Sequence, residues 1–277
     1  MANPVKIKNL LPLDKMLPIA ERGQFAVGAY SARSTTMVDP VLRAGQKNHS
    51  PLIVQISQKE FARYGLSARE FADEFYRKLF ELSISVPVGL HLDHTTDLTI
   101  IWEAIAAGFT SVMIDASAKP LEENIAISKE VVDYAHARGV AVEAELGRIG
   151  TTDFVETEED EEFYTQPEEA LRFVQKTKVD ALAVSVGTAH GVYTVRKPKI
   201  DYERLKAIRA LTPVSLVIHG GSGIPEGMLH QAYQLVGGGV SKVNIATDLE
   251  LAYRQALGID HHLTNAELAG LSAVEKA

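Results

Sequence analysis

The sequence has no cysteine, no long apolar run and no excess of basic residues, and each absence excludes a class of protein. Without cysteine there can be no disulfide framework, no thiolate nucleophile and no thiolate zinc site, so any metal must be bound by His, Asp or Glu. No apolar stretch approaches the ~20 residues of a membrane span. Residues 1–23 lack the basic region, apolar stretch and cleavage site of a signal peptide. We therefore expect a cytoplasmic protein that makes no membrane contact.

Acidic residues outnumber basic ones, with 36 Asp and Glu against 28 Lys and Arg, which gives a formal charge of -8. No basic tract is present that would neutralise a phosphate backbone, so nucleic acid is not an expected partner. Hydrophobic residues make up 46% of the chain, as in ordinary globular proteins.

What the chain does contain is a regular alternation of short apolar runs with amphipathic segments of helical spacing. The apolar runs, rich in Val, Ile, Leu and Ala, are 25–29, 52–57, 88–92, 111–115, 141–146, 181–186, 215–219 and 242–246. The amphipathic segments include 98–107, 121–137, 167–176, 202–211 and 225–235. Eight strands alternating with helices over about 250 residues fit an α/β fold of the (β/α)8 TIM-barrel type better than an open doubly wound sheet. We predict one TIM-barrel domain over residues 1–277.

Histidines stand at the ends of three of these expected strands. His94 lies in HLDH, His190 in GTAHG, and His219 directly before a glycine pair. The chemistry of a TIM barrel gathers where the strands end, and three imidazoles with room for a substrate oxygen are the pattern of a catalytic zinc site. A single histidine is more often structural, but three at strand ends favour a metal. Because alternate strand residues share a face, His91 and Asp93 point together, and His94 joins the site only if the backbone bends.

The segment HGGSG predicts an anion site, because glycines let backbone N–H groups approach a phosphate and Ser222 adds a hydroxyl. Asn244 and Thr247 follow at the end of the last strand, where TIM barrels often complete a phosphate site. A tight turn without a ligand is the alternative interpretation of the glycines.

The segments HLDH, EAELGRIG, VGTAHGVY, PKIDYERL, VIHGGSGIP and KVNIAT together resemble the class II, metal-dependent ketose-bisphosphate aldolases. The resemblance to this family of fructose- and tagatose-bisphosphate aldolases runs from about Phe25 to Leu257. It implies reversible cleavage of a ketose 1-phosphate or 1,6-bisphosphate to dihydroxyacetone phosphate and an aldehyde, with zinc stabilising the enediolate. It also implies a homodimer or homotetramer, and leaves room for a monovalent cation, Na⁺ or K⁺.

The resemblance assigns roles to individual residues. By this match His94, His190 and His219 bind zinc, and Asp93 transfers a proton at the oxygen of the aldehyde carbon. Glu145 lies near the metal as an outer or alternative ligand. The residues that match the family's phosphate site are Gly191, Gly220, Gly221, Ser222, Asn244 and Thr247.

The zinc mechanism needs no lysine nucleophile, in contrast to class I aldolases, which use a lysine amine. The one strand-borne candidate is Lys242, at the beginning of the expected last strand and away from its catalytic end. We interpret Lys242 as a structural or surface residue.

Two segments depart from the family pattern. Where the family has Gly-Gly followed by Glu-Asp after EAELG, this chain has RIGTTDF. In the family, this loop handles the proton on the enediolate carbon. Here either Asp153 contacts substrate in place of the usual glutamate, or the acids from Glu156 onward do. The third alternative is that this proton transfer is weakened. The first strand reads Ala-Tyr-Ser, ending at Ser31, instead of Ala-Phe-Asn, whereas Ser57 matches a family serine near the substrate. These differences favour a divergent sugar specificity.

Two other functions remain open on the sequence alone. One is a non-catalytic, aldolase-like subunit that binds phosphosugars, and the other is a phosphosugar isomerase or epimerase on the same barrel. Retention of Asp93 favours catalysis. The acidic run at 156–162 lies in an expected loop over 147–166, which is either simply solvated or an active-site lid.

Overall fold

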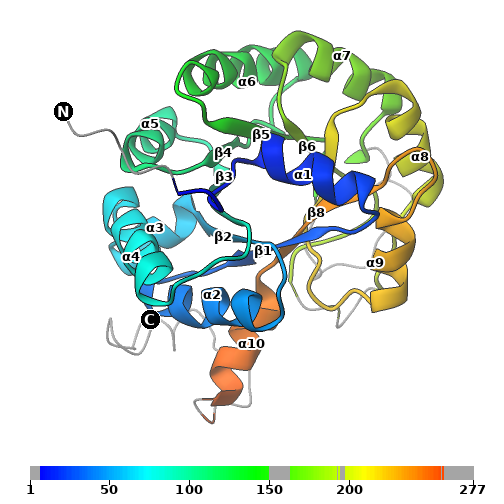
Figure 1. Cartoon of the computed structure of the whole chain (residues 1–277). Helices are drawn as coiled ribbons and strands as arrows, with labels where there is room; N and C mark the ends of the chain where they lie inside the picture. The colour runs from blue at the N-terminus through cyan, green and yellow to red at the C-terminus, as the bar shows by residue number, and fades with distance from the viewer. Residues whose placement is uncertain (1–6, 150–162, 192, 194–196, 257, 259–277) are drawn as a thin grey trace.

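The computed structural model describes residues 7–149, 163–191, 193, 197–256 and 258 (Figure 1). Eight parallel strands pair in sequence order, and the first also pairs with the last, so the barrel is closed. The strands are β1 (Val27–Ser31), β2 (Leu52–Ser57), β3 (Val88–Thr95), β4 (Ser111–Ile114), β5 (Ala141–Leu146), β6 (Ala181–Val184), β7 (Ser215–Ile218) and β8 (Val240–Ile245). The predicted TIM barrel is confirmed.

Helices surround the barrel and connect its strands, as Figure 1 shows. They are α1 (Leu13–Arg22), the 3₁₀ turn η1 (Thr35–Met37), α2 (Val38–Lys47), α3 (Gln58–Tyr64), α4 (Ala68–Glu81), α5 (Leu98–Ala107), α6 (Leu121–His136), α7 (Pro167–Thr177), α8 (Tyr202–Leu211), α9 (Glu226–Tyr233) and α10 (Thr247–Ala256). Helices α5 and α8 have the predicted bounds. Strand β8 begins two residues before the expected 242–246, which places Lys242 well inside the strand.

Two apolar cores result from the alternation of side chains along each strand. Large residues on the outer faces, such as Leu90 and Val142, pack against the helices with Phe71, Phe75 and Phe173. The inner core is made of small and medium residues of five strands. These are Val27, Ala29, Ile53, Ala141, Ala181, Ala183 and Val217.

Helix α1 closes one end of the barrel. Its buried residues Leu13, Met16, Leu17 and Ala20 belong to the inner core, and Figure 1 shows the helix crossing the barrel opening. This is the end at which the strands begin. The interior is therefore sealed by apolar packing at that end, and the polar side chains lie at the end where the strands finish.

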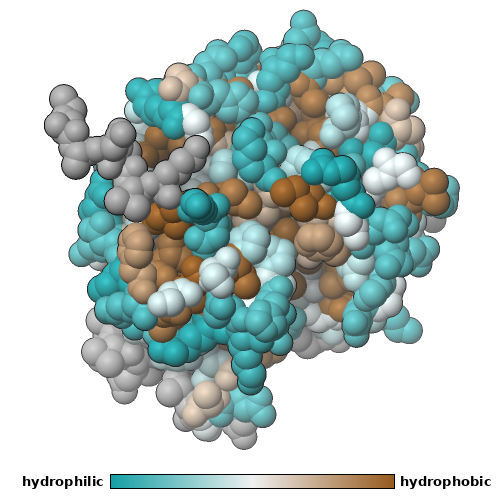
Figure 2. Space-filling model, in the orientation of Figure 1, coloured by the Kyte–Doolittle hydropathy of each residue, from teal (hydrophilic) through white to brown (hydrophobic). Residues whose placement is uncertain are grey.

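The surface at the α1 end carries both hydrophilic and hydrophobic residues. Figure 2 shows hydrophilic residues over much of the outer ring and hydrophobic ones nearer the centre. Within the described part of the chain, no helix combines the length and apolar character needed to cross a membrane.

Candidate metal centre and active site

Three histidines from three strand ends meet at the carboxyl end of the barrel. His94 lies in β3, while His190 and His219 follow β6 and β7. The centroid of the His94 ring is 4.5 Å from that of His219 and 5.1 Å from that of His190, and the other two rings are 5.9 Å apart. Each ring offers a nitrogen within 4.8 Å of the others. The predicted meeting of these three rings is therefore confirmed, while their role as metal ligands stays a prediction.

His94 reaches the cluster because the backbone bends at the end of β3. Its φ is 28°, in the left-handed region, and the pairing of β3 with β4 shifts between Leu92 and Thr95. Positive φ is costly for a residue with a side chain, and such strain is typical of functional sites. The backbone bend that His94 needs in order to join the site is therefore present.

The two ring nitrogens of His94 have different surroundings. Nδ1 lies 2.9 Å from the Oδ2 oxygen of Asp115, which directly follows β4. Nε2 is buried and has no hydrogen-bond partner. A carboxylate on one nitrogen and a second nitrogen left for a metal is the usual arrangement of a metal-binding histidine.

His219 is fully buried between two acids of β5. Its Nε2 lies 2.9 Å from Oε1 of Glu143, and its Nδ1 lies 3.0 Å from Oε2 of Glu145. An imidazole with one proton donates to only one of these carboxylates. The other nitrogen and its facing oxygen then need a proton or a cation between them, which fits a metal bound here.

The histidines differ in their affinity for protons. Burial lowers the pKa of His190 to about 3, so this ring is neutral and one of its nitrogens has an electron pair available for a metal. Burial also acts to lower the pKa of His94, but the charge of Asp93 and the hydrogen bond to Asp115 raise it to about 10. For His219, burial and the charge of His94 oppose protonation, yet the two glutamates raise its pKa.

Among the described residues around the three histidines, negative charge is in excess. Asp93 and Glu143 lie within metal-binding distance of His91, and Asp115 and Glu145 lie within the same distance of His94. In the metal-free protein, Lys242 and a protonated His94 offset only part of the charge of these four acids, and burying unpaired charge is costly. A divalent cation would balance most of the excess, and imidazole nitrogens favour zinc.

Asp93 is held in place by two amide side chains. Its Oδ1 accepts a hydrogen bond from Nδ2 of Asn244 at 3.1 Å, and its Oδ2 accepts one from Nε2 of Gln55 at 3.1 Å. Gln55 also donates to the hydroxyl of Ser31. Burial would raise the pKa of Asp93, but the charges of His94 and Lys242 outweigh it and lower the pKa. The carboxylate is therefore ionised and oriented beside His94.

The glycine turn after β7 packs too tightly for larger residues. Gly220 has a φ of 66°, and an added Cβ would lie 2.2 Å from the backbone oxygen of Ala189. The N–H of Gly221 donates to the backbone oxygen of Asn244 at 3.0 Å. Tyr193 joins this turn to the loop after β6, because its hydroxyl contacts the backbone of both Ala189 and Gly220.

Ser222 connects the same turn to the beginning of α10. Its hydroxyl oxygen accepts hydrogen bonds from the N–H groups of Ala246, at 3.2 Å, and Asp248, at 3.1 Å. Thr247 is the first residue of α10, and Gly191 directly follows His190. The predicted phosphate residues thus belong to the ends of β6, β7 and β8, and their contact with phosphate stays a prediction.

Three comparisons with known proteins identify the family of this chain. The family model of class-II fructose-bisphosphate aldolase matches residues 12–276. The chain belongs to this aldolase family. It is 39% identical to a fructose-bisphosphate aldolase of Geobacillus stearothermophilus over 249 residues, covering 90% of this chain and 85% of that protein. A fructose-bisphosphate aldolase of Staphylococcus aureus is 38% identical over 248 residues, with 90% and 85% covered.

Solved structures agree with the class II aldolase fold. The YdjI aldolase from Escherichia coli K12 superposes with a TM-score of 0.78 at 32% identity, covering 94% of this chain and 90% of that chain. A protein from Coccidioides immitis, described as a putative fructose-1,6-biphosphate aldolase, has a TM-score of 0.75 at 31% identity, with 95% and 93% covered. The predicted family and the predicted enzyme class, an aldolase among the carbon–carbon lyases, are both confirmed.

Several residues of this class II aldolase site were not predicted from the sequence. Glu143, Asp115 and Gln55 each contact a candidate ligand or Asp93. Glu143 stands two residues before Glu145 on β5, so strand alternation already put both acids on one face. Asp115 ends the run SVMID, at a strand end like the histidines.

Two predicted substrate contacts have a different status. Ser57 ends β2 and lies opposite Asp93 in the strand register, but its hydroxyl donates to Glu60 at 2.7 Å. Asp153 and the acidic run 156–162 lie outside the described residues. Both substrate contacts stay predictions.

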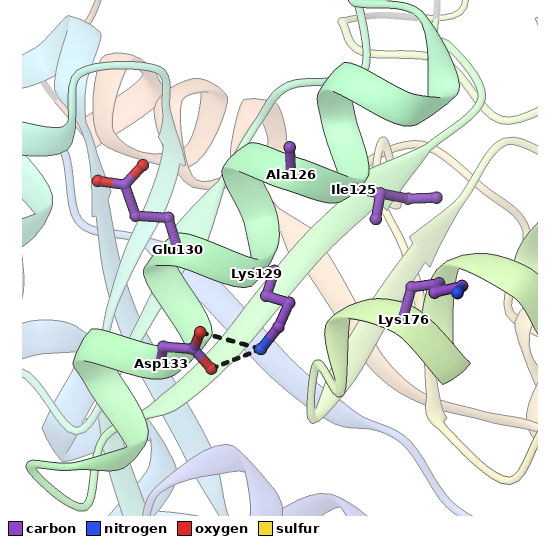
Figure 3. A pocket seen from close by; sticks show the side chains of 6 residues that line it. All are labelled: Ile125, Ala126, Lys129, Glu130, Asp133 and Lys176. Carbon is purple, nitrogen blue, oxygen red and sulfur yellow. Dashed lines mark hydrogen bonds and ion pairs between the residues drawn. The ribbon is translucent and has the colours of Figure 1, made fainter.

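A separate hollow lies on the outside of this aldolase barrel. Figure 3 shows its lining, with Ile125, Ala126, Lys129, Glu130 and Asp133 coming from α6 and Lys176 from α7. Lys129 is paired with Asp133 at 2.8 Å. Apart from the buried Ile125, the hollow is lined by exposed residues of outer helices, and it contains none of the candidate site residues.

Proposed function

We propose that this class II aldolase reversibly cleaves a ketose 1-phosphate or 1,6-bisphosphate into dihydroxyacetone phosphate and an aldehyde. The observation that carries the proposal is the unpartnered Nε2 of His94, which lies in a cluster with His190 and His219 beside an ionised Asp93. A metal site next to an oriented carboxylate supplies the two functions that carbon–carbon cleavage of a ketose needs.

The donor set fits zinc, which we place at His94, His190 and His219, with Glu145 as an outer or alternative ligand. Bound zinc supplies Lewis-acid stabilisation of the negative charge that develops on the substrate oxygen. A monovalent cation, Na⁺ or K⁺, stays a further expectation from the family resemblance.

Asp93 is the proposed proton-transfer group. Its carboxylate accepts the proton of the hydroxyl that becomes the aldehyde, and returns it in the direction of synthesis. The hydrogen bonds from Asn244 and Gln55 fix both of its oxygens, so the group is oriented before substrate arrives. The buried position beside His94 also limits competing protonation by water.

The proposed phosphate site is the turn after β7 together with the beginning of α10. The positive end of a helix favours anions, and Ser222 links the turn to the first residues of α10. Ser31 stands where the family has asparagine, and its hydroxyl is used by Gln55. This difference supports a sugar specificity that diverges from fructose 1,6-bisphosphate.

The test combines a metal assay with a substrate screen. The purified protein is analysed for zinc, and then incubated with the 1-phosphates and 1,6-bisphosphates of fructose and tagatose while dihydroxyacetone phosphate is measured. We expect about one zinc per chain and release of dihydroxyacetone phosphate from at least one sugar. Bound zinc without cleavage of any of them would support a phosphosugar-binding role, and interconversion without two products would support an isomerase or epimerase.

Removal of the metal provides the matched control. A chelator should abolish cleavage, and added zinc should restore it in the same sample. A homodimer or homotetramer, a cytoplasmic location and a single domain over residues 1–277 stay predictions, of which the first is tested by mass measurement in solution.

A further inference from the structure

Lys242 is a charged residue in the interior of the barrel. Its side chain has 0% exposure and is among the largest fully buried side chains of the described residues. Of the two interpretations of Lys242, as a structural or a surface residue, the surface one is wrong, because β8 begins at Val240 and the third residue of the strand points inward. A buried ammonium group is costly unless it is paired, so its partners show what it does.

The ammonium group has two close partners, one on each side. Nζ lies 2.9 Å from Oε2 of Glu143 in an ion pair, and it donates to Oδ1 of Asn244 at 2.7 Å. Each partner contacts one group of the proposed reaction. Glu143 contacts His219, and Asn244 contacts Asp93.

The donor and acceptor chemistry of this chain allows one arrangement on the Asn244 side. An ammonium group only donates, so the oxygen of the Asn244 amide must face Lys242. The amide nitrogen then faces Asp93, at 3.1 Å from Oδ1. Lys242 thereby determines which end of the amide meets the proton-transfer carboxylate.

The hydrogen-bond roles of Glu143 and His219 follow from the same donor and acceptor chemistry. A carboxylate paired with an ammonium group only accepts, so the contact with Glu143 is a hydrogen bond when Nε2 of His219 carries the hydrogen. In a neutral ring this leaves the electron pair on Nδ1, which is the nitrogen that faces Glu145. An outer partner that selects the tautomer of a histidine also selects which nitrogen binds a metal.

We propose that Lys242 is a positioning residue that acts on both halves of the site, on the metal-binding tautomer of His219 through Glu143 and on the orientation of Asp93 through Asn244. The inference rests on the proposed metal site. It assigns Lys242 no contact with substrate and no covalent step. The Lys242 ammonium group is thus connected to His219 through Glu143 and to Asp93 through Asn244.

The alternative is that Lys242 only neutralises the buried Glu143. Two variants separate these roles. Lys242→Met removes the cation and both contacts, whereas the double variant Glu143→Gln with Lys242→Met also removes the uncompensated carboxylate. If charge balance were the whole role, the double variant would restore both stability and zinc affinity.

We expect the double variant to regain thermal stability but not zinc affinity. Both variants should bind zinc about 10-fold to 100-fold more weakly than the unaltered protein in competition with a chelator, as is typical when an outer partner of a metal ligand is lost. At saturating zinc, Lys242→Met should still lower kcat by about 10-fold or more, because Asp93 has lost its fixed amide partner. Unaltered zinc affinity and kcat in Lys242→Met, or full recovery of both in the double variant, would overturn the proposal.

A measurement on the unaltered protein covers the case in which the variants do not fold. In zinc-loaded protein with ¹⁵N-labelled histidine, the His219 resonances should show hydrogen on Nε2 and metal on Nδ1. Metal on Nε2 would refute the role of Glu143 and Lys242 while leaving the aldolase proposal intact. Failure of the unaltered protein to bind zinc would instead overturn the metal centre, and this inference with it.

Discussion

The Nδ1 nitrogen of His94 lies 2.9 Å from the Oδ2 oxygen of Asp115, and these residues belong to the ends of neighbouring strands. The contact uses one nitrogen of the ring and leaves Nε2 buried without a partner. His219 is held in a comparable way by Glu143 on Nε2. Two of the three candidate ligands thus have a carboxylate that orients the ring, which is how proteins usually prepare a zinc site.

The first prediction separates metal binding from proton transfer. His94→Ala and His190→Ala should each lose zinc and activity, because each removes one of three nitrogen donors. Asp93→Ala should retain zinc but lose turnover, since it removes the proton-transfer group. Zinc content and kcat are measured on the same preparations. His230→Ala, at an exposed position of α9, is the control that should change neither, and unchanged zinc content in both ligand variants would overturn the assignment.

The second prediction concerns the pH dependence of zinc binding. The metal-free protein holds a proton on His94 up to a pKa of about 10, and zinc must displace that proton. Zinc affinity should therefore rise with pH, by about tenfold per unit for one displaced proton, between about pH 7 and about pH 9. Calorimetry in buffers of different ionisation enthalpy counts the released protons. A zinc affinity that does not change over this range would contradict the prediction.

The raised pKa of His94 also affects the stability of the metal-free protein. The pKa of His94 is raised from 6.5 to about 10, so its contribution to the free energy of unfolding is fully present below pH 6.5. That contribution is lost as the pH rises through about 10. Chelator-treated protein should therefore unfold more easily in this upper range, and His94→Gln should remove most of the dependence.

The third prediction tests whether Ser57 contacts substrate or only begins α3. Oε2 of Glu60 accepts hydrogen bonds from both the backbone N–H and the hydroxyl of Ser57, and Glu70 does the same for Ser67 at the beginning of α4. Alanine at either serine should lower the free energy of unfolding by about 1 kcal/mol, the usual effect of losing a helix cap. Only Ser57→Ala should also raise KM. Equal KM values in the two variants would show that Ser57 is a cap alone.

The barrel could be predicted because strands buried on both faces read as continuous apolar runs. The histidines could be predicted as a group because strand ends meet at one end of a barrel. The Lys242–Glu143 pair could not, since it depends on the register across the barrel and on a strand that begins earlier than its apolar run. Strand alternation shows that His94 joins the site only if the backbone bends, but the sequence alone does not show that the bend occurs or that it takes the form of a positive φ.

The last prediction uses two glycines with opposite surroundings. Gly220→Ala should destabilise the protein, because its φ of 66° is unfavourable for a side chain and the new Cβ would meet the backbone oxygen of Ala189 at 2.2 Å. The backbone conformation alone costs about 1–3 kcal/mol. Gly227→Ala is the control, because Gly227 lies in α9 with nothing within 4 Å of an added Cβ. It should stabilise the protein by roughly 0.5–1 kcal/mol, since alanine favours a helix over glycine. Denaturant midpoints of the two variants measure both effects, and a Gly220→Ala protein as stable as the unaltered one would show that the turn after β7 relaxes more easily than its contacts indicate.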